Sequence, residues 1–304
     1  MSERILPNLA LGTSLAIAVA MLAMPASAQN PQVISDETVT GFKFPESVAY
    51  DPDANALYVS EFVSELKPTE KDGQGRIAKV ALDGTVEEER FLPAEGQTLH
   101  KPKGIWVQGD RLWVTDIDSL WVFDTSTKEG KRVELPGIQF ANDPTILGDA
   151  VYVSDNRGDQ LFRVEPADFL ESEGDPEVTR VFAGAGINPN GVYPAADGSL
   201  LMVGFQSAEE PRGIYRMEPS GEPQPIAEDL GRLDGVYQME DGTLLVTDWD
   251  SGALGAWDEN MGFQELATGF KGPADFAVVP NAEGLLVVVP DLLQSELRLI
   301  QLGQ

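Results

Sequence analysis

A short sequence motif, here called the phrase, recurs six times along the chain. It consists of a polar residue beside Pro, Gly, Ser or Leu, followed by a few apolar residues in strand-like order. The copies begin at Pro45, Pro102, Asn142, Pro189, Leu233 and Pro273. Successive copies lie 57, 40, 47, 44 and 40 residues apart, measured at Glu46, Lys103, Asp143, Asn190, Asp234 and Ala274. Apart from the longer first step, this spacing is typical of a β-propeller, whose blades repeat about every 40 to 50 residues.

Each copy opens a unit of several expected strands, so the sequence predicts an all-β chain of six blades. Second strands are expected at residues 57–60, 112–115, 151–154, 200–203, 244–247 and 285–289. Third strands are expected at residues 77–82, 120–123, 161–164, 214–217, 254–257 and 297–302. More polar outer strands are expected at residues 131–135, 178–182 and 263–267. A β-sandwich is the alternative, but sandwiches lack a period of about 40 residues.

The sixth unit has three expected strands, which leaves one edge of its sheet unpaired. A strand-like stretch that begins at Val33 and ends at Phe42 precedes the first unit and has no place in it. We predict that this stretch completes the sixth blade, because ring closure removes an exposed edge that promotes aggregation. The predicted fold is therefore a six-bladed β-propeller closed by its N-terminal strand.

The first 28 residues have the pattern of a bacterial export signal. Arg4 gives a positive start, an apolar stretch runs from Leu9 to Met24, and the small residues up to Ala28 predict cleavage before Gln29. The short apolar stretch and the cleavage site disfavour an uncleaved membrane anchor. We expect a signal peptide over residues 1–28, one propeller domain over residues 29–304, and a periplasmic or secreted protein that leaves the membrane after cleavage.

The chain has a formal net charge of −29, from 50 acidic residues against 21 Lys and Arg. Binding to nucleic acid or anionic lipid needs cationic groups that neutralise phosphates, so this charge excludes both classes of partner. The acids are spread along the chain, which indicates a solvated surface rather than an acidic binding tail. No Cys is present, so neither a disulfide nor a Cys-linked lipid is expected.

The opening polar residues should gather at one mouth of a central channel, because the first strand of each propeller blade is the innermost. They are Glu46, Lys103, Asn142, Asp143, Asn190 and Asp234. The segment Asp248-Trp249-Asp250 should line the same mouth. Carboxylate and amide oxygens suit Ca²⁺, which takes about six to eight oxygen ligands. Ca²⁺ is the expected cofactor, with Mg²⁺, Mn²⁺ and Zn²⁺ as alternatives, although a chain with no Cys and a single His lacks the usual zinc ligands.

The phrases also carry a family resemblance. Glu46 in Pro-Glu-Ser, Asn142-Asp143, Asn190-Gly191 and Asp234-Gly235 resemble, in the same order, the metal-site series of the gluconolactonase and regucalcin (senescence marker protein) family. That family consists of six-bladed propellers in which Glu, Asn and Asp hold one divalent cation at the axis. The resemblance implies that Glu46, Asn190 and Asp234 are metal ligands, that Asn142 lies at the metal and the substrate, and that Asp234 is the proton acceptor.

Two positions depart from that family. Lactonases of the family often have an Arg two residues before the Asn of the third blade, where it holds sugar hydroxyls, and here that position is Phe140. Lys103 adds a cation to the ring, either to stabilise an oxyanion, to orient an anionic substrate, or, as the favoured interpretation, to neutralise nearby acids. Asp143 and His100 complete the expected substrate-binding set, with His100 as a base near the mouth or an incidental surface residue.

Two functions follow from these features. The first is hydrolysis of a lactone or other small ester, in which a cation activates the carbonyl and water while Asp234 accepts the proton. The alternative is a non-enzymatic binding module similar to NHL-repeat propellers, which would hold a small ligand or a protein at the same face. A small molecule is the expected substrate or ligand in the first case, and the identity of a protein partner stays open in the second.

Overall fold

The computed structural model describes Met1 and residues 31–303. Apart from Met1, the predicted signal peptide and its cleavage site lie outside the described residues. Within residues 31–303 the chain forms strands, turns and loops without a helix. No helix in this part of the chain is therefore long and apolar enough to cross a membrane.

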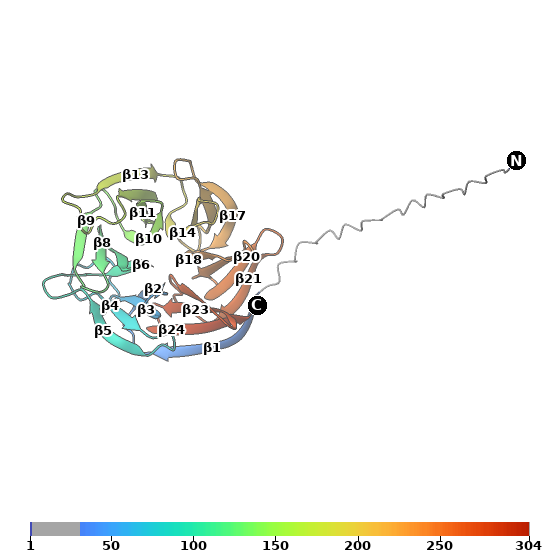
Figure 1. The fold of residues 1–304 in the computed structure, drawn as a ribbon, viewed down its shortest axis with the longest axis horizontal. Helices are drawn as coiled ribbons and strands as arrows, with labels where there is room; N and C mark the ends of the chain where they lie inside the picture. Colours follow the sequence, from blue (N-terminus) through green and yellow to red (C-terminus); the bar gives the residue numbers. More distant parts are fainter. Residues whose placement is uncertain (2–30, 304) are drawn as a thin grey trace.

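Six four-stranded antiparallel sheets surround a central channel as the blades of a propeller (Figure 1). The first two blades comprise β2 (Pro45–Asp51), β3 (Ala56–Glu61), β4 (Arg76–Val80), β5 (Val86–Leu92), β6 (Pro102–Gln108), β7 (Arg111–Asp116), β8 (Ser119–Asp124) and β9 (Gly130–Glu134). The next two comprise β10 (Ala141–Leu147), β11 (Ala150–Asp155), β12 (Gln160–Glu165), β13 (Glu177–Ala183), β14 (Pro189–Pro194), β15 (Leu200–Gly204), β16 (Arg212–Met217) and β17 (Gln224–Gly231). The last two comprise β18 (Leu233–Gln238), β19 (Leu244–Asp248), β20 (Ala253–Asp258), β21 (Gly262–Thr268), β22 (Ala277–Asn281), β23 (Gly284–Asp291), β24 (Glu296–Gly303) and β1 (Gln32–Thr40).

The N-terminal strand closes the ring, as predicted. β1 pairs antiparallel with β24, from Val33 opposite Leu302 to Thr40 opposite Glu296. The sixth sheet therefore has the order β1-β24-β23-β22, and its outer edge is supplied by the start of the fold (Figure 1). An ion pair between Asp36 and Arg298 joins the two strands. Closure of this kind places the first and last strands of the fold in one sheet.

The expected second and third strands are present within a few residues of their predicted limits. Two outer strands, β5 and β17, were not predicted, because at least half of their side chains are exposed and several are charged. β22 also begins at Ala277, later than the sixth phrase at Pro273. The residues between them are held by isolated bridges from Pro273 to Asp291 and from Ser47 to Asp275.

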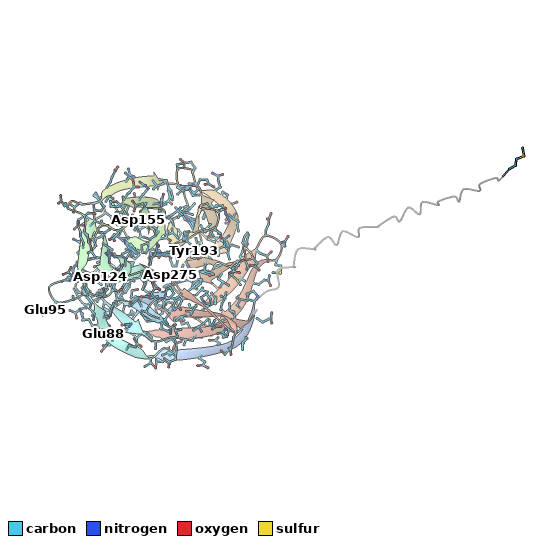
Figure 2. All side chains as sticks on the ribbon, viewed as in Figure 1. Glu88, Glu95, Asp124, Asp155, Tyr193 and Asp275 are labelled. Carbon is cyan, nitrogen blue, oxygen red and sulfur yellow. The ribbon has the colours of Figure 1, made fainter. Side chains whose placement is uncertain are left out.

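The apolar core consists of clusters between neighbouring blades. One cluster joins blade one to blade six, where Val48, Leu57 and Val59 pack with Val288 and Leu297. Burial of such side chains is the main force that holds adjacent blades together. Acidic residues such as Glu88 and Glu95 lie at the periphery of the ring, whereas Asp275 and Tyr193 lie near its middle (Figure 2).

Acids at the ends of second strands fix the entry of the first strands. Asp116 accepts hydrogen bonds from the backbone N–H groups of His100 and Lys101, both at 2.8 Å. Asp248 accepts a hydrogen bond from the backbone N–H of Arg232 at 3.1 Å. Each contact joins the end of a second strand to the segment that leads into the first strand of the same blade. These bonds position the residues that open the inner strands.

Candidate functional site

The inner strands begin around a cavity of about 560 Å³ at one mouth of the channel, here called the first cavity. Its lining includes the four predicted metal ligands Glu46, Asn142, Asn190 and Asp234. Trp249 lines it as well, as expected from the segment after β19. The first cavity therefore brings together oxygen donors from four blades that are far apart in the sequence.

Local irregularities in the strands aim these side chains into the channel. The pairing between β18 and β19 shifts register between Leu233 and Val236, and the pairing between β14 and β15 shifts between Pro189 and Val192. A bulge at such a point adds a residue to one strand and turns its side chain out of the regular alternation. Asp234 and Asn190 occupy these bulges.

Glycine follows the polar residue where neighbouring inner strands come close. A Cβ atom on Gly191 would lie 2.2 Å from the backbone oxygen of Asp234, and one on Gly104 would lie 2.4 Å from Oδ1 of Asp143. The Asn-Gly and Asp-Gly pairs, which are common in turns, lie here within strands β14 and β18. Their glycines leave room for the next blade.

The two carboxylates of the first cavity are buried and poorly compensated. Glu46 and Asp234 are each 7% exposed, and Oε2 of Glu46 has no hydrogen-bond partner. Burial, together with repulsion from Asp234, raises the pKa of Glu46 well above its usual value. Burial and the nearby Asp275 raise the pKa of Asp234 to about 8. Hydrogen bonds partly oppose this shift, including one from Nε1 of Trp249 to Oδ2 of Asp234 at 3.0 Å.

This donor set fits a hard cation. The amide nitrogen of Asn142 donates to Oδ1 of Asn190, so the two amides are held together beside the carboxylates. Among the described residues no group of three or more Asp, Glu, His or Cys side chains is arranged to hold a metal by itself. A cation here would use the amide oxygens as well as the two carboxylates, and an all-oxygen set of this kind suits Ca²⁺. The unpartnered oxygen of Glu46 is the clearest sign that a positive charge belongs in the cavity.

Lys103 is fully buried and is not among the residues that line the first cavity. Its Nζ donates to the backbone oxygen of Lys101 at 3.3 Å and lies 4.2 Å from the centre of the Phe140 ring. Burial lowers the pKa of Lys103 to about 8, although Asp116 and Glu46 oppose the shift. No ion pair joins Lys103 to an acid in residues 31–303, so its influence on Glu46 acts through space.

Two arginines that the sequence did not single out also line the first cavity. The guanidinium carbon of Arg157 lies 4.1 Å from the centre of the Phe140 ring. The Arg157 side chain is exposed and forms no ion pair within the described part of the chain. Arg232 pairs with Asp250 at 2.6 Å and lies over the ring of Phe205. Arg157 follows β11, and a search of the loops after second strands would have found it, since these loops surround the same mouth.

Some of the remaining predicted residues line the first cavity, and others lie elsewhere in the structure. Phe140 and Asn142 line the first cavity. His100 does not, and its Nδ1 instead accepts a hydrogen bond from the backbone N–H of Gly73 at 2.9 Å. Asp143 lies deeper in the channel, where it lines a second cavity together with Asp275. Burial raises the pKa of Asp143 above its usual value and that of Asp275 to about 6. Asp275 was missed because the sixth phrase was aligned on Ala274.

No protein-family model matches the sequence, and no curated protein matches it. Several solved structures do. A gluconolactonase from Xanthomonas campestris is 16% identical, with a TM-score of 0.64 over 92% of this chain and 97% of that one. Regucalcin, a calcium-binding protein from Agrobacterium tumefaciens, is 16% identical, with a TM-score of 0.60 over 87% and 92% of the two chains. Virginiamycin B lyase from Staphylococcus aureus, solved with quinupristin, is 15% identical, with a TM-score of 0.55 over 88% and 99%.

These similarities concern the fold. The chain has the six-bladed propeller architecture of gluconolactonase and regucalcin proteins, which confirms the resemblance drawn from the phrases at the level of the fold. The lyase has a similar fold and is named for a different reaction. Since one fold carries several chemistries, the function of this chain has to be argued from the first cavity.

Proposed function

We propose that this protein hydrolyses a lactone or other small ester in the first cavity, with the help of a bound divalent cation. The observation that carries the proposal is the pair of buried carboxylates, Glu46 and Asp234, which meet Asn142 and Asn190 in one open cavity. The name of the gluconolactonase structure, which has the same fold, supports this reaction class, and the description of regucalcin as a calcium-binding protein supports the cation.

Glu46, Asn190, Asp234 and Asn142 would hold the cation, with Ca²⁺ as the first choice and Mg²⁺, Mn²⁺ or Zn²⁺ as alternatives. When bound, the cation would polarise the substrate carbonyl and lower the pKa of water. Trp249 orients the Asp234 carboxylate through its hydrogen bond to Oδ2. To act as a base, Asp234 needs one carboxylate oxygen that does not bind the cation. Its surroundings raise the pKa of the carboxyl group and so favour acceptance of a proton.

The chain's own groups account for the proton transfers. Asp234 takes a proton as water adds to the carbonyl carbon, and the ring C–O bond of the lactone then breaks. The same carboxyl group returns the proton to the alkoxide that leaves. The product is a hydroxy acid, which ionises to a carboxylate near neutral pH. Lys103 contributes through space, because it lies outside the cavity lining and contacts Phe140.

Phe140, Phe205 and Trp249 give the first cavity apolar walls, and Arg157 places a cation at its edge. This combination favours a lactone whose ring is less polar than a sugar lactone and which carries an anionic or strongly polar substituent. Phe140 takes the place of an Arg that would bind sugar hydroxyls, and Arg157 supplies a guanidinium to the same cavity from the loop between β11 and β12 of the same blade.

The alternative is a binding propeller that holds a small ligand or a protein at this mouth. It is favoured by the position of His100, which is hydrogen-bonded to the backbone of Gly73 outside the cavity lining. The lining therefore contains no histidine that could act as a base, and Asp234 remains as the candidate base. In both cases the N-terminal pattern supports export to the periplasm or beyond, and the strong negative charge argues against nucleic acid as a partner. The N-terminus of the protein recovered from cells, read by mass spectrometry, would test cleavage before Gln29.

Metal analysis and a substrate panel test the proposal. The purified protein should contain one equivalent of a divalent cation and hydrolyse at least one member of a panel of aldonolactones, aliphatic lactones and aryl esters. Asp234→Asn should remove the activity, whereas Asp241→Asn, which alters an exposed turn in the same blade, should retain it. A protein that binds the cation but turns over no substrate with any of the four metals would favour the binding module.

A further inference from the structure

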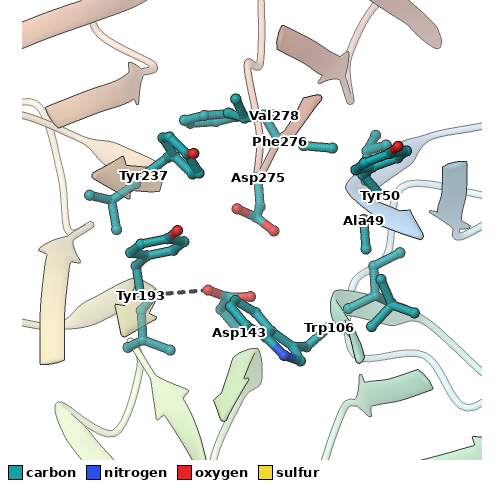
Figure 3. Close-up of a pocket in the computed structure, with 15 residues that line it drawn as sticks. Ala49, Tyr50, Trp106, Asp143, Tyr193, Tyr237, Asp275, Phe276 and Val278 are labelled. Carbon is teal, nitrogen blue, oxygen red and sulfur yellow. Dashed lines mark hydrogen bonds between the residues drawn. The ribbon is translucent and has the colours of Figure 1, made fainter. Parts of the chain in front are cut away.

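A second cavity, of about 200 Å³, lies toward the opposite end of the channel. Figure 3 shows the residues that line it. Its aromatic lining comes from five blades and consists of Tyr50, Trp106, Tyr193, Tyr237 and Phe276. On β2, β14 and β18 these residues come after the ones that line the first cavity, as Tyr237 comes after Asp234 along β18. The two cavities therefore lie at different depths of one channel.

Three of the aromatic rings lie next to one another. The ring centres of Trp106 and Tyr193 are 6.1 Å apart, and those of Tyr193 and Tyr237 are 5.1 Å apart with the planes tilted by 58°. These three side chains are only partly buried. Nε1 of Trp106 is buried without a hydrogen-bond partner. Large aromatic surfaces that stay accessible around a cavity are typical of a ligand site.

Two carboxylates line the same cavity beside the aromatic rings. Figure 3 shows the side chains of Asp143 and Asp275 directed toward the centre of the cavity. Oδ2 of Asp143 accepts a hydrogen bond from the backbone N–H of Val192 at 2.8 Å, and Oδ2 of Asp275 accepts one from Oγ of Ser47 at 2.6 Å. Asp143 is only 6% exposed. Neither carboxylate forms an ion pair in the part of the chain that the structure describes, so an acid that ionises here has no compensating cation.

The inner strands are shaped around these carboxylates. A Cβ atom on Gly104 would lie 2.4 Å from Oδ1 of Asp143, and one on Gly235 would lie 3.0 Å from Oδ1 of Asp275. Any larger residue at either glycine would push a carboxylate away from its position. The two glycines therefore leave the space that the acids occupy.

The composition of the second cavity selects the class of ligand. Ionised Asp143 and Asp275 would repel an anion, and a neutral ligand would supply no charge to compensate them, whereas a cation would favour their ionised form. Ca²⁺ prefers about six to eight oxygens, whereas this cavity offers two carboxylates among aromatic rings. An alkylated ammonium ion matches both parts of the lining, because its spread positive charge is attracted to carboxylates and to the faces of aromatic rings.

We propose that the second cavity binds the head group of a small alkylated ammonium ion, with Asp143 and Asp275 beneath the charge and Trp106, Tyr193 and Tyr237 around the alkyl groups. This site does not depend on the proposed hydrolase activity. The two sites share the channel and a charge interaction between Asp275 and Asp234, and the ligand of the second site enters from the opposite mouth.

A matched pair of ligands tests whether binding depends on the positive charge of the ligand. Choline and 3,3-dimethylbutan-1-ol have similar shapes, but carbon replaces the ammonium nitrogen in the alcohol. Calorimetric titration of the purified full-length protein should show choline binding at least about tenfold tighter than the alcohol. Equal affinities would mean an apolar pocket without cation selectivity. No binding of choline or of tetramethylammonium up to about 10 mM, a range in which weak sites are still detected, would overturn the proposal.

Variants locate the site. Tyr193→Leu should weaken choline binding about tenfold, and Tyr193→Phe should restore it because the ring face is kept. Asp275→Asn should reduce the preference for choline over the alcohol. Trp249→Leu removes an aromatic side chain from the first cavity and should leave choline affinity unchanged. If Trp249→Leu weakens choline instead, the ion binds in the first cavity and the assignment to the second is wrong. Should Tyr193→Leu fail to fold, Asp275→Asn and the ligand pair still decide.

Discussion

The two ends of the channel are built from the same inner strands, yet one end is lined by oxygen donors and the other by aromatic rings. On β18 and on β14 the change takes only three residues, from Asp234 to Tyr237 and from Asn190 to Tyr193. In a regular strand, residues three apart point to opposite faces. Here a bulge at the start of each strand brings both side chains into the channel. The comparison shows that one short irregularity lets a single strand serve two sites of different chemistry.

Breaking the ring should remove both cavities and is the largest effect we expect. Deletion of residues 29–42 removes β1 and exposes the edge of β24. The variant should aggregate or lose much of its melting temperature, because an unpaired edge strand promotes association. Circular dichroism and light scattering measure both outcomes. A soluble variant with unchanged melting would contradict the role of β1 in closing the ring.

Removal of the cation should affect only the first cavity. At a free Ca²⁺ concentration about a thousandfold above the dissociation constant, binding stabilises the fold by roughly 4 kcal/mol, so chelator should lower the melting temperature and Ca²⁺ should restore it. Glu46→Ala and Asp234→Ala should abolish this response. Tyr237→Phe, at the opposite end of the channel, should keep it. If all four proteins melt alike with and without chelator, no cation binds in the first cavity.

Two substitutions on strand β18 form a matched pair that tests the catalytic role of Asp234. Asp234→Asn should lower kcat by about a hundredfold or more, since it removes the proton acceptor while retaining the shape of the side chain. Tyr237→Phe, three residues further along β18, should retain activity. Steady-state kinetics on the best lactone of the panel measures both variants. Activity that survives Asp234→Asn would reject Asp234 as the base.

The pH dependence of stability should report the buried acids of both cavities. Folding raises the pKa of Asp234 to about 8 and that of Asp275 to about 6, so each folded carboxyl keeps a proton that the unfolded chain releases above about pH 4. In chelator, stability should therefore fall as pH rises from about 4 to 8, since the unfolded state then binds fewer protons. Asp234→Asn should flatten the curve between about pH 6 and 8. Thermal melts at constant ionic strength give the curve, and stability that rises over this window would contradict the assigned directions.

The smallest effect concerns substrate choice at the first cavity. Arg157→Leu should raise KM about fivefold for lactones that carry a carboxylate, because one partly exposed charged contact is lost. Values for neutral lactones and kcat should change little. Arg180→Leu, on the outer strand β13, is the matched control. An equal rise in KM for charged and neutral lactones would show that Arg157 acts by packing on Phe140 instead.

Much of the first cavity was accessible from the sequence because its polar residues recur at blade spacing. Glu46, Asn142, Asn190 and Asp234 were predicted to meet, and they line one cavity. Arg157 was missed since it follows a second strand rather than opening a first one. Its proximity to Phe140 depends on how far a loop of blade three reaches toward the channel. No local pattern of residues encodes that distance.

The sequence by itself determined the number of blades, the order of strands and the closing role of the N-terminal strand, because blade spacing and strand alternation are local periodicities that survive in a linear chain. The tertiary structure decided which charges are buried. Lys103 is enclosed beside Phe140, and Asp143 and Asp275 come together beneath aromatic rings from other blades. Burial and the meeting of charges depend on how neighbouring blades pack, and bulges decide which way each side chain turns. The burial of these charged groups and the directions of their side chains are therefore determined only when the ring is closed.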